Sequence, residues 1–402
     1  MEHLPADTRR SILLLSFATF SSMAAQRLCD AMLPELAREF SISLAQAAQT
    51  ISFFAITYGL SQLFYGPLGD RLGKFRVVAL ATLGSSLGSL LAVFADSLSM
   101  LVVARVLAAL GAAAIIPLSM AWIGDQVAYE QRMETLARVG LGSTLGLAAG
   151  QSLGGLFTDT LGWRWAFVFM TLLSGAVGTL LWRNWRQQQR QPQVAHETQD
   201  AVRPSFLQQT FTIYTGRWSR LILLLAFLEG GVGFGAMAIW PSHLHRVLGL
   251  SLAASGAIVA LFGLGGMLYM ALARWLIPRF GERGLALLGV SILLLSVGVF
   301  VLSPHWLPTL PASLLAGFGF FMFHNTMQGN ATQMAPAARG AAMSLFAFTL
   351  FTGQSIGVIA AAALAQRFGS GTIILLSAAV MFALGAALSL ALRRRDAWMQ
   401  LA

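Results

Sequence analysis

Residues 66–76 read Gly-Pro-Leu-Gly-Asp-Arg-Leu-Gly-Lys-Phe-Arg and connect two long apolar runs. Three cations, one acid and three glycines meet in a connection that is too short to hold a domain. Glycine allows close packing against neighbouring helix ends, and Asp70 is placed to cap one of those ends. This stretch therefore predicts a charged turn between two membrane-spanning helices.

The composition indicates an integral membrane protein. Of 402 residues, 56% are hydrophobic and 10% are charged, whereas a soluble domain carries about 25% charged residues. A bilayer-spanning helix needs about 20 mostly apolar residues. Twelve such runs occur, at roughly 11–34, 44–65, 77–95, 98–123, 136–157, 164–182, 219–241, 251–276, 284–303, 307–328, 341–365 and 371–392. Because backbone groups in lipid must be paired internally, we predict an all-α fold of twelve transmembrane helices. The first run is too long for a cleavable signal peptide, so we expect it to be the first span.

The cations are distributed unevenly over the predicted loops. With a cytoplasmic amino terminus, most of the arginines and both ends of the chain fall on one side. The opposite side keeps only Arg38, Arg164, Arg246 and Arg367. Loop cations set orientation, which predicts cytoplasmic termini in a plasma membrane, the inner membrane of a bacterium. The net charge of +10 then reflects topology and attraction to anionic lipid, and no nucleic-acid partner is expected.

The chain divides into two similar halves. We predict an amino-terminal six-helix bundle at 1–183, a cytoplasmic linker at 184–218 with a short surface helix near 206–214, and a carboxy-terminal six-helix bundle at 219–402. Ser43-Leu-Ala recurs as Ser251-Leu-Ala, and other short matches share an offset close to 208 residues. Two pseudo-symmetric bundles around a midplane site are the architecture of rocking secondary transporters.

Three motifs resemble those of the major facilitator superfamily, in particular its twelve-span drug:proton antiporters. Residues 66–76 resemble motif A, residues 105–111 resemble motif B, and residues 146–155 resemble the antiporter motif C, with Gln151 in place of its proline. The resemblance implies transport by alternating access and a role for Arg105 in proton coupling. It also implies that Asp70 engages the start of span eleven, near residues 340–343, when the cytoplasmic side is closed.

Charged residues inside the spans are candidates for proton coupling: Glu229, Asp30 and Arg105. A charge at the bilayer centre costs about 2.5–3.5 kcal/mol on insertion scales, so each should face a cavity or a partner. Burial disfavours the charged form of Glu229, and a cationic substrate would favour it and expel a proton. The alternatives are a hydrogen-bonded structural glutamate, a local Arg27–Asp30 salt bridge, and a snorkelling Arg105.

Polar and aromatic residues within the spans could line a substrate cavity. The candidates are Arg27, Gln151, Phe227, Phe234, Trp240, His324, Asn325, Gln328 and Gln354. His324 can titrate near neutral pH, although a single histidine is often only a hydrogen-bonded structural residue. Phe227, Phe234 and Trp240 are spaced so that one helical face could present them to an organic cation, with ordinary core packing as the alternative.

Two further sets have structural roles in this interpretation. The cytoplasmic gate is assigned to Gly66, Asp70, Arg71, Gly73, Lys74, Arg76 and Asp125. Within it, Arg71 is expected to pair with Asp125, which leaves Lys74 and Arg76 for lipid headgroups. Close helix packing is assigned to Gly146, Gly150, Gly154, Gly155, Gly353 and Gly357, which form small-residue steps in spans five and eleven.

Together these features predict a secondary transporter that exports small organic, amphipathic or cationic compounds in exchange for protons. A narrower exporter, or a proton-coupled importer of a sugar, amino acid or other metabolite, is the alternative. The chain lacks the phosphate-binding loop, catalytic spacing and sizeable soluble domain that an ATP-driven protein, a membrane enzyme or a sensor would need. We therefore expect no enzyme activity, cofactor or metal site. The expected partners are the substrate, protons and membrane lipids, and a monomer suffices.

Overall fold

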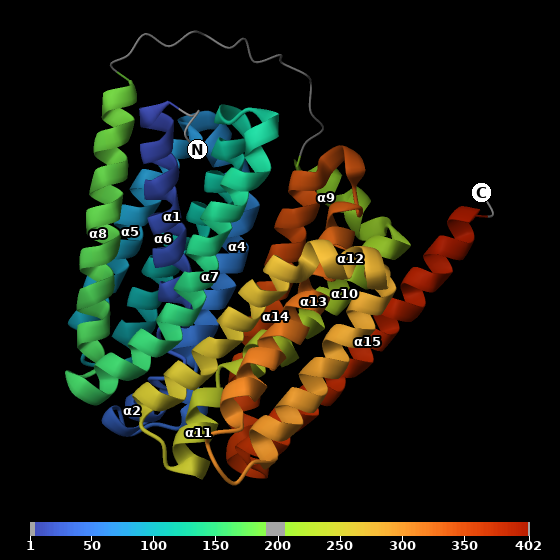
Figure 1. Cartoon of the computed structure of the whole chain (residues 1–402). Helices are drawn as coiled ribbons and strands as arrows, with labels where there is room; N and C mark the ends of the chain where they lie inside the picture. Colours follow the sequence, from blue (N-terminus) through green and yellow to red (C-terminus); the bar gives the residue numbers. More distant parts are fainter. Residues whose placement is uncertain (1–4, 190–205, 401–402) are drawn as a thin grey trace.

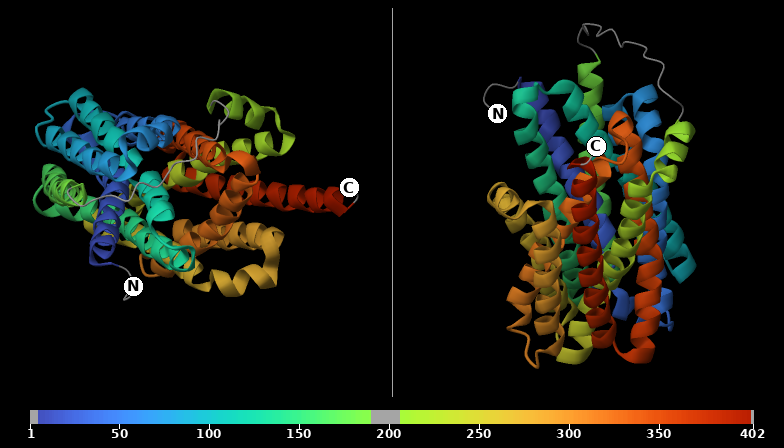
Figure 2. Two further views of the ribbon diagram at one scale, coloured as in Figure 1. Left: turned by 90° about the horizontal axis from the view of Figure 1, so that it is seen from above. Right: turned by 90° about the vertical axis from the view of Figure 1, so that its right-hand side faces the viewer.

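The computed structural model describes residues 5–189 and 206–400, and within these ranges the regular structure is entirely helical. Two bundles stand side by side and lean against each other (Figure 1). Seen from above, the amino-terminal and carboxy-terminal halves of the chain lie on separate sides, and α14 lies beside α4 (Figure 2). We call the end that holds the start of α1 and the end of α8 the linker end, and the opposite end the far end.

The first bundle contains eight helices, because a short helix follows the first span and another precedes the second. They are α1 (Ala6–Arg27), α2 (Leu33–Glu39), α3 (Leu44–Ala47), α4 (Gln49–Leu72), α5 (Lys74–Val93), α6 (Leu98–Gln126), α7 (Tyr129–Thr160) and α8 (Trp163–Gln188). The first span was expected to reach residue 34, but its helix ends at Arg27. Pro34 lies at the start of α2, a position that suits proline and begins a new helix.

The second bundle is built in the same way after the predicted surface helix, which forms α9. Its elements are α9 (Phe206–Thr215), α10 (Arg217–Leu228), the π-helix η1 (Glu229–Gly235), α11 (Trp240–Leu248), α12 (Leu252–Leu302), α13 (Thr309–Thr332), the 3-10 turn η2 (Pro336–Ala338), α14 (Arg339–Phe368) and α15 (Ser370–Gln400). The middle of the predicted linker, residues 190–205, lies outside the described residues. α12 covers predicted spans eight and nine and turns between its two arms at Gly281, whose φ is +58°.

The fold agrees with the prediction of an all-α membrane protein. Seven helices in the described ranges are long and apolar enough to cross a membrane, with α12 counted once. The pair formed by residues 33–39 and 44–72, bent by 111°, also qualifies when taken together. α1, α7 and α13 occupy three more of the predicted spans and are 22, 32 and 24 residues long.

Glycines bring equivalent helix pairs of the two bundles into close contact. On α7, the Cβ positions of Gly146 and Gly150 are filled by backbone of α1, and that of Gly154 is filled by backbone of Leu28, which directly follows α1. On α14, the Cβ positions of Gly353 and Gly357 are filled by backbone of α10 and η1. Any side chain at these positions would separate the helices, so the small residues set the spacing on which each bundle depends.

The two bundles meet mainly along α7 with α12 and along α4 with α14. Backbone atoms of α12 fill the Cβ position of Gly155, and a Cβ at Gly59 would lie 2.8 Å from Phe351 Cβ. Ser52 Oγ and Ser355 Oγ share a hydrogen bond of 2.8 Å across this interface. The interface therefore runs through the middle and far part of the molecule.

Candidate functional site

The site is centred on η1, where the helix of span seven changes its winding. Four of its seven residues are glycine, so the segment has little α-helical propensity and can approach α14 closely. Single-turn π segments occur often at functional sites. The expectation that Phe227, Phe234 and Trp240 share one face assumed a continuous α-helix. The π winding breaks that register, and the three side chains lie in different surroundings.

Glu229, the first residue of η1, is fully buried and pairs with a histidine from another helix. Its Oε1 lies 2.8 Å from Nδ1 of His324 on α13. Its Oε2 is buried and has no hydrogen-bond partner among the described residues. The structure thus brings together two candidates that lie 95 residues apart in sequence. Sequence reasoning had named both residues but had not joined them.

Aromatic rings enclose this pair. Phe320 stacks on His324 with ring centroids 5.8 Å apart, and Phe234 meets the same imidazole edge-on at 5.7 Å. Trp240 lies farther along, against Phe300 at 4.7 Å, and reaches the Phe234 cluster only through other rings. Phe227 is half-buried outside this cluster.

A second polar cluster lies in the first bundle and reaches across to the second. Arg27 Nη1 donates to Asp30 Oδ2 at 3.2 Å, and Gln151 Nε2 donates to the same oxygen at 3.4 Å. The Arg27 guanidinium also lies 4.9 Å from the centre of the Phe234 ring. A continuous series of contacts therefore runs from Asp30 through Arg27, Phe234 and His324 to Glu229.

Arg105 on α6 is buried and held by backbone carbonyls. It donates to the carbonyl of Ala25 at 2.7 Å and to that of Thr50 at 3.2 Å, and it lies over the Phe54 ring at 4.1 Å. These carbonyls belong to α1 and α4, so the side chain ties three helices of one bundle together. It is not a snorkelling residue at the membrane surface.

The remaining polar candidates are less closely connected. Gln354 on α14 is buried, and neither side-chain amide atom has a hydrogen-bond partner within the described ranges. Asn325 and Gln328 are half-buried on α13, and no hydrogen bond between described residues joins them to Glu229. Across residues 5–189 and 206–400, no group of three or more His, Cys, Asp or Glu side chains is arranged to hold a metal ion.

The stretch 66–76 is mostly helical rather than a loop. α4 continues through Pro67 to Leu72, and the turn is confined to Gly73, whose φ is +88°. Only glycine adopts this backbone conformation readily, so the turn is fixed at this one residue. At Gly66 a Cβ would meet nothing within 4 Å.

The ion pairs of this gate segment differ from the expected ones. Asp125 pairs with Lys74 at 2.5 Å, and Lys74 Nζ also lies 3.6 Å from Asp70. The predicted Arg71–Asp125 pair is therefore wrong, because Lys74 occupies the position between the two acids. Lys74 is thus engaged by two acids and not left for lipid headgroups, whereas Arg76 lies over the Trp185 ring at 5.3 Å. No hydrogen bond of the described residues joins Asp70 to α14, and the Asp70 side chain is 59% exposed.

At the far end, the structure shows an inter-bundle contact that sequence reasoning missed. Asp159 Oδ2, at the end of α7, accepts a 2.6 Å hydrogen bond from the backbone N–H of Ala253 at the start of α12. The available signal was weak: Asp159 lies two residues beyond the end of predicted span five, and Ser251-Leu-Ala resembles a helix start.

A separate polar cluster fastens the far-end loops of the first bundle. Glu39 accepts hydrogen bonds from Trp163 Nε1 at 2.5 Å and Arg164 Nη1 at 2.6 Å, and Arg164 also donates to the carbonyl of Ala95. Partial burial would raise the pKa of Glu39, but the hydrogen bonds from Arg164 and Trp163 outweigh it and hold that pKa below its ordinary value.

Comparison with known protein families places this architecture among transporters. The sequence model described as Major Facilitator Superfamily matches residues 15–358. The chain is 24% identical to the inner membrane transport protein YnfM of Escherichia coli K12, over 86% of this chain and 82% of that protein. It is 25% identical to multidrug resistance protein D of the same organism, over 91% of this chain and 88% of that protein.

Another relative and two solved structures are also described as transport or resistance proteins. A multidrug resistance protein B homologue of Mycobacterium tuberculosis is 25% identical over 79% of this chain and 69% of its own length. Among solved structures, a bacterial homologue of the human lysosomal transporter Spinster, inward-facing and unoccupied, superposes with a TM-score of 0.76 at 16% identity, covering 96% of this chain and 97% of that one. The nucleoside transporter NupG superposes with a TM-score of 0.72 at 13% identity, covering 95% and 98%. At these identities the structures establish the fold alone.

Proposed function

Since this chain belongs to the Major Facilitator Superfamily, a family of membrane transporters, we propose that it exports small organic, amphipathic or cationic compounds in exchange for protons. The observation that carries this proposal is the buried pair between Glu229, the first residue of the π-helical segment of span seven, and His324 on α13. Relatives that are described as multidrug resistance proteins give independent support for the substrate class.

The chemistry of the pair explains why it would hold one proton. With one proton shared between the carboxyl and imidazole groups, the pair is neutral overall. Removing that proton leaves one uncompensated negative charge among Phe234, Phe320 and other apolar groups. Removing one partner of a buried ion pair costs about 3–5 kcal/mol, and loss of the proton likewise leaves the carboxylate without its positive partner. In this proposal the pair releases its proton when another positive charge replaces it.

A cationic substrate supplies that replacement. When the cation binds beside Glu229, its positive charge balances the carboxylate after the proton has left. Oε2 of Glu229, which has no partner among the described residues, can accept a hydrogen bond from the substrate. The surrounding rings offer π faces to an organic cation, an interaction worth about 2 kcal/mol when the site is dry. Substrate and proton thus compete for one site, which is the minimal requirement for exchange.

The Arg27–Asp30 pair gives the first bundle a share in the same site. Arg27 contacts the Phe234 ring of the opposite bundle and pairs with Asp30, so a displacement of this ring would change the surroundings of the pair. In this proposal Asp30 is a second site for a proton or cation, and Arg105 holds α1 in position for it.

The orientation follows from the loop cations. We place the linker end and both termini in the cytoplasm, and the far end outside. The bundles are then joined on the outside by Asp159 and Ala253, while on the cytoplasmic side no hydrogen bond between described residues joins Asp70 to α14. This arrangement corresponds to an inward-facing state, and the opposite state would cap α14 with Asp70 at its positive end. A monomer is sufficient for this cycle.

Overproduction of the protein in bacterial cells tests this function. We expect lower accumulation of several unrelated lipophilic cations, such as ethidium and tetraphenylphosphonium, and restored accumulation after addition of an uncoupler. The Glu229→Gln variant should accumulate the cations like cells without the protein, whereas Glu134→Gln, an exposed acid outside the site, should behave as wild type. Reduced accumulation that persists with uncoupler would contradict proton coupling, and activity toward a single metabolite would favour the narrower exporter or importer.

A further inference from the structure

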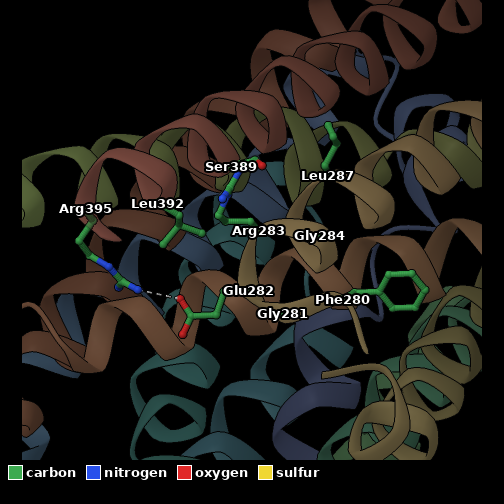
Figure 3. A pocket seen from close by; sticks show the side chains of 9 residues that line it. All are labelled: Phe280, Gly281, Glu282, Arg283, Gly284, Leu287, Ser389, Leu392 and Arg395. Carbon is green, nitrogen blue, oxygen red and sulfur yellow. Dashed lines mark hydrogen bonds and ion pairs between the residues drawn. The ribbon is translucent and has the colours of Figure 1, made fainter. Parts of the chain in front are cut away.

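A pocket of about 550 Å³ lies at the linker end of the second bundle, apart from the Glu229 site. It is formed by the turn of α12 on one side and the last part of α15 on the other (Figure 3). The turn exists because Gly281 adopts a positive φ of +58°, which sets the following residues against α15. These residues are the repeat of the motif A segment, and the transport mechanism does not use them.

The lining combines positive charge with hydroxyl and apolar groups. Arg283 and Ser389 face each other from the two elements, while Glu282 is turned toward Arg395 (Figure 3). Glu282 is already engaged, since Arg395 lies 3.2 Å from it and Asn330 Nδ2 lies 3.3 Å from it. Arg283 makes no hydrogen bond or ion pair with other described residues. The pocket therefore presents one uncommitted cation beside a neutralised acid.

The surroundings extend the positive charge and add an apolar wall. Residues 274–283 and 393–396 carry six arginines against two acids. Phe280 and Leu287 line the pocket and remain 45% and 41% exposed, on a hairpin whose neighbours Trp275 and Ile277 are also exposed. In a membrane protein such exposed apolar side chains face lipid chains, so the pocket adjoins both the basic surface and the hydrocarbon.

We propose that this pocket binds the headgroup of an anionic phospholipid. The phosphate lies against Arg283 and the Ser389 hydroxyl, and the acyl chains run along Phe280 and Leu287. A charge-assisted contact between guanidinium and phosphate is stronger than a neutral hydrogen bond. A soluble phosphate compound shares the headgroup chemistry but has no use for the apolar wall, which is why we assign the site to a lipid. The bound lipid holds the α12 turn against α15.

Thermal unfolding of the purified full-length protein in detergent tests the assignment. Dioleoylphosphatidylglycerol should raise the melting temperature of the wild type more than dioleoylphosphatidylcholine does. Arg283→Ala should lose more than half of the difference between the two lipids, and Arg283→Lys should keep most of it. Arg279→Ala is the matched control, because Arg279 lies on the same turn, over Trp275 and outside the pocket, and its response should equal that of the wild type.

Native mass spectrometry gives the second readout, since it counts retained lipids whether or not stability changes. The wild type should retain one more phosphatidylglycerol than Arg283→Ala. Equal retention by the two proteins, or an equal lipid-dependent shift, would overturn the proposal. A saturable shift of the same size with inorganic phosphate or glycerol 3-phosphate would assign the site to a soluble anion and also overturn it.

Discussion

Asp159 and Ala253 join the two bundles at the far end, where the Asp159 carboxylate accepts a hydrogen bond from the backbone N–H of Ala253 in the first turn of α12. The contact has the chemistry expected of motif A at the opposite end, where no hydrogen bond between described residues joins Asp70 to α14. An acid at a helix amino terminus is stabilised by the helix dipole and by hydrogen bonds that the helix cannot supply itself. The two acids would thus act as alternate latches of one rocking cycle.

Removing the far-end latch should favour the state that is open at this end. A hydrogen bond to a charged group is worth about 1.5–3 kcal/mol, so Asp159→Ala should shift the equilibrium about tenfold or more. Spin labels at residues 161 and 247, which are exposed on different bundles at this end, would report the change as a longer distance in a Cys29→Ser background. Asp96→Ala is the control, because Asp96 is an exposed acid at the same end and makes no hydrogen bond or ion pair with the other bundle within the described ranges. Identical distance distributions for Asp159→Ala and wild type would remove Asp159 from the gate.

Close packing of α7 on α1 should make Gly150 intolerant of even a methyl group. A Cβ there would lie 2.9 Å from Ala24 Cα and against the carbonyl of the same residue, so Gly150→Ala must separate the helices. Overpacking of this kind costs about 1–3 kcal/mol, which should lower the melting temperature in detergent. Gly140→Ala on the same helix meets nothing within 4 Å and should be neutral or slightly stabilising. Equal melting temperatures for the two variants would contradict the packing.

Variants of the Arg27–Asp30 pair should show whether the pair has a structural role, a functional role or both. Asp30→Asn leaves Arg27 buried without its counter-charge, and we expect destabilisation of about 3–5 kcal/mol. The double variant Arg27→Met/Asp30→Leu removes both charges and should recover most of the melting temperature. Because the acid is proposed to hold a proton or cation, transport should stay lost in the double variant. Recovery of transport together with stability would show that the pair is only a local salt bridge.

Glu39 should make the far-end loops sensitive to acid. Its pKa in the folded protein lies below the ordinary glutamate value of about 4.3, so the folded state favours the carboxylate. This contribution to stability is complete above the unfolded pKa and is lost as the pH falls through the folded one. The melting temperature of Glu39→Gln should therefore lie below that of wild type at neutral pH, and the gap should close in acid. A gap that persists unchanged at acidic pH would exclude the carboxylate as its cause.

The bundle architecture could be predicted from the sequence because this architecture depends on features that are local in the chain. Long apolar runs, small-residue steps and the basic linker predict helices, close helix pairs and the surface helix α9, all from neighbours in sequence. The same locality explains two failures. Residues 66–72 were expected to be a loop because glycine and proline are frequent there, but the helix of α4 continues through them. The first span was predicted to end at residue 34, seven residues after the actual helix end at Arg27, because apolar character does not reveal where a helix ends.

The connections within the site could not be predicted in this way. Glu229 was conspicuous as an acid inside a span, and His324 as a histidine inside another, but their pairing depends on how α13 packs on η1. The π winding was also hidden, since a glycine-rich segment allows it without requiring it. Lys74 displaced Arg71 as the partner of Asp125 because the turn at Gly73 decides which side chain faces α6.

Substrate-induced proton release from the purified protein tests the central claim most directly. Wild type and Glu134→Gln, in weakly buffered detergent solution, should release protons when a transported cation such as ethidium is added. Glu229→Gln cannot exchange a proton at this position and should release none, while its melting temperature shows that it remains folded. Proton release by Glu229→Gln equal to that of wild type would contradict the assignment of Glu229 as the carrier of the exchanged proton.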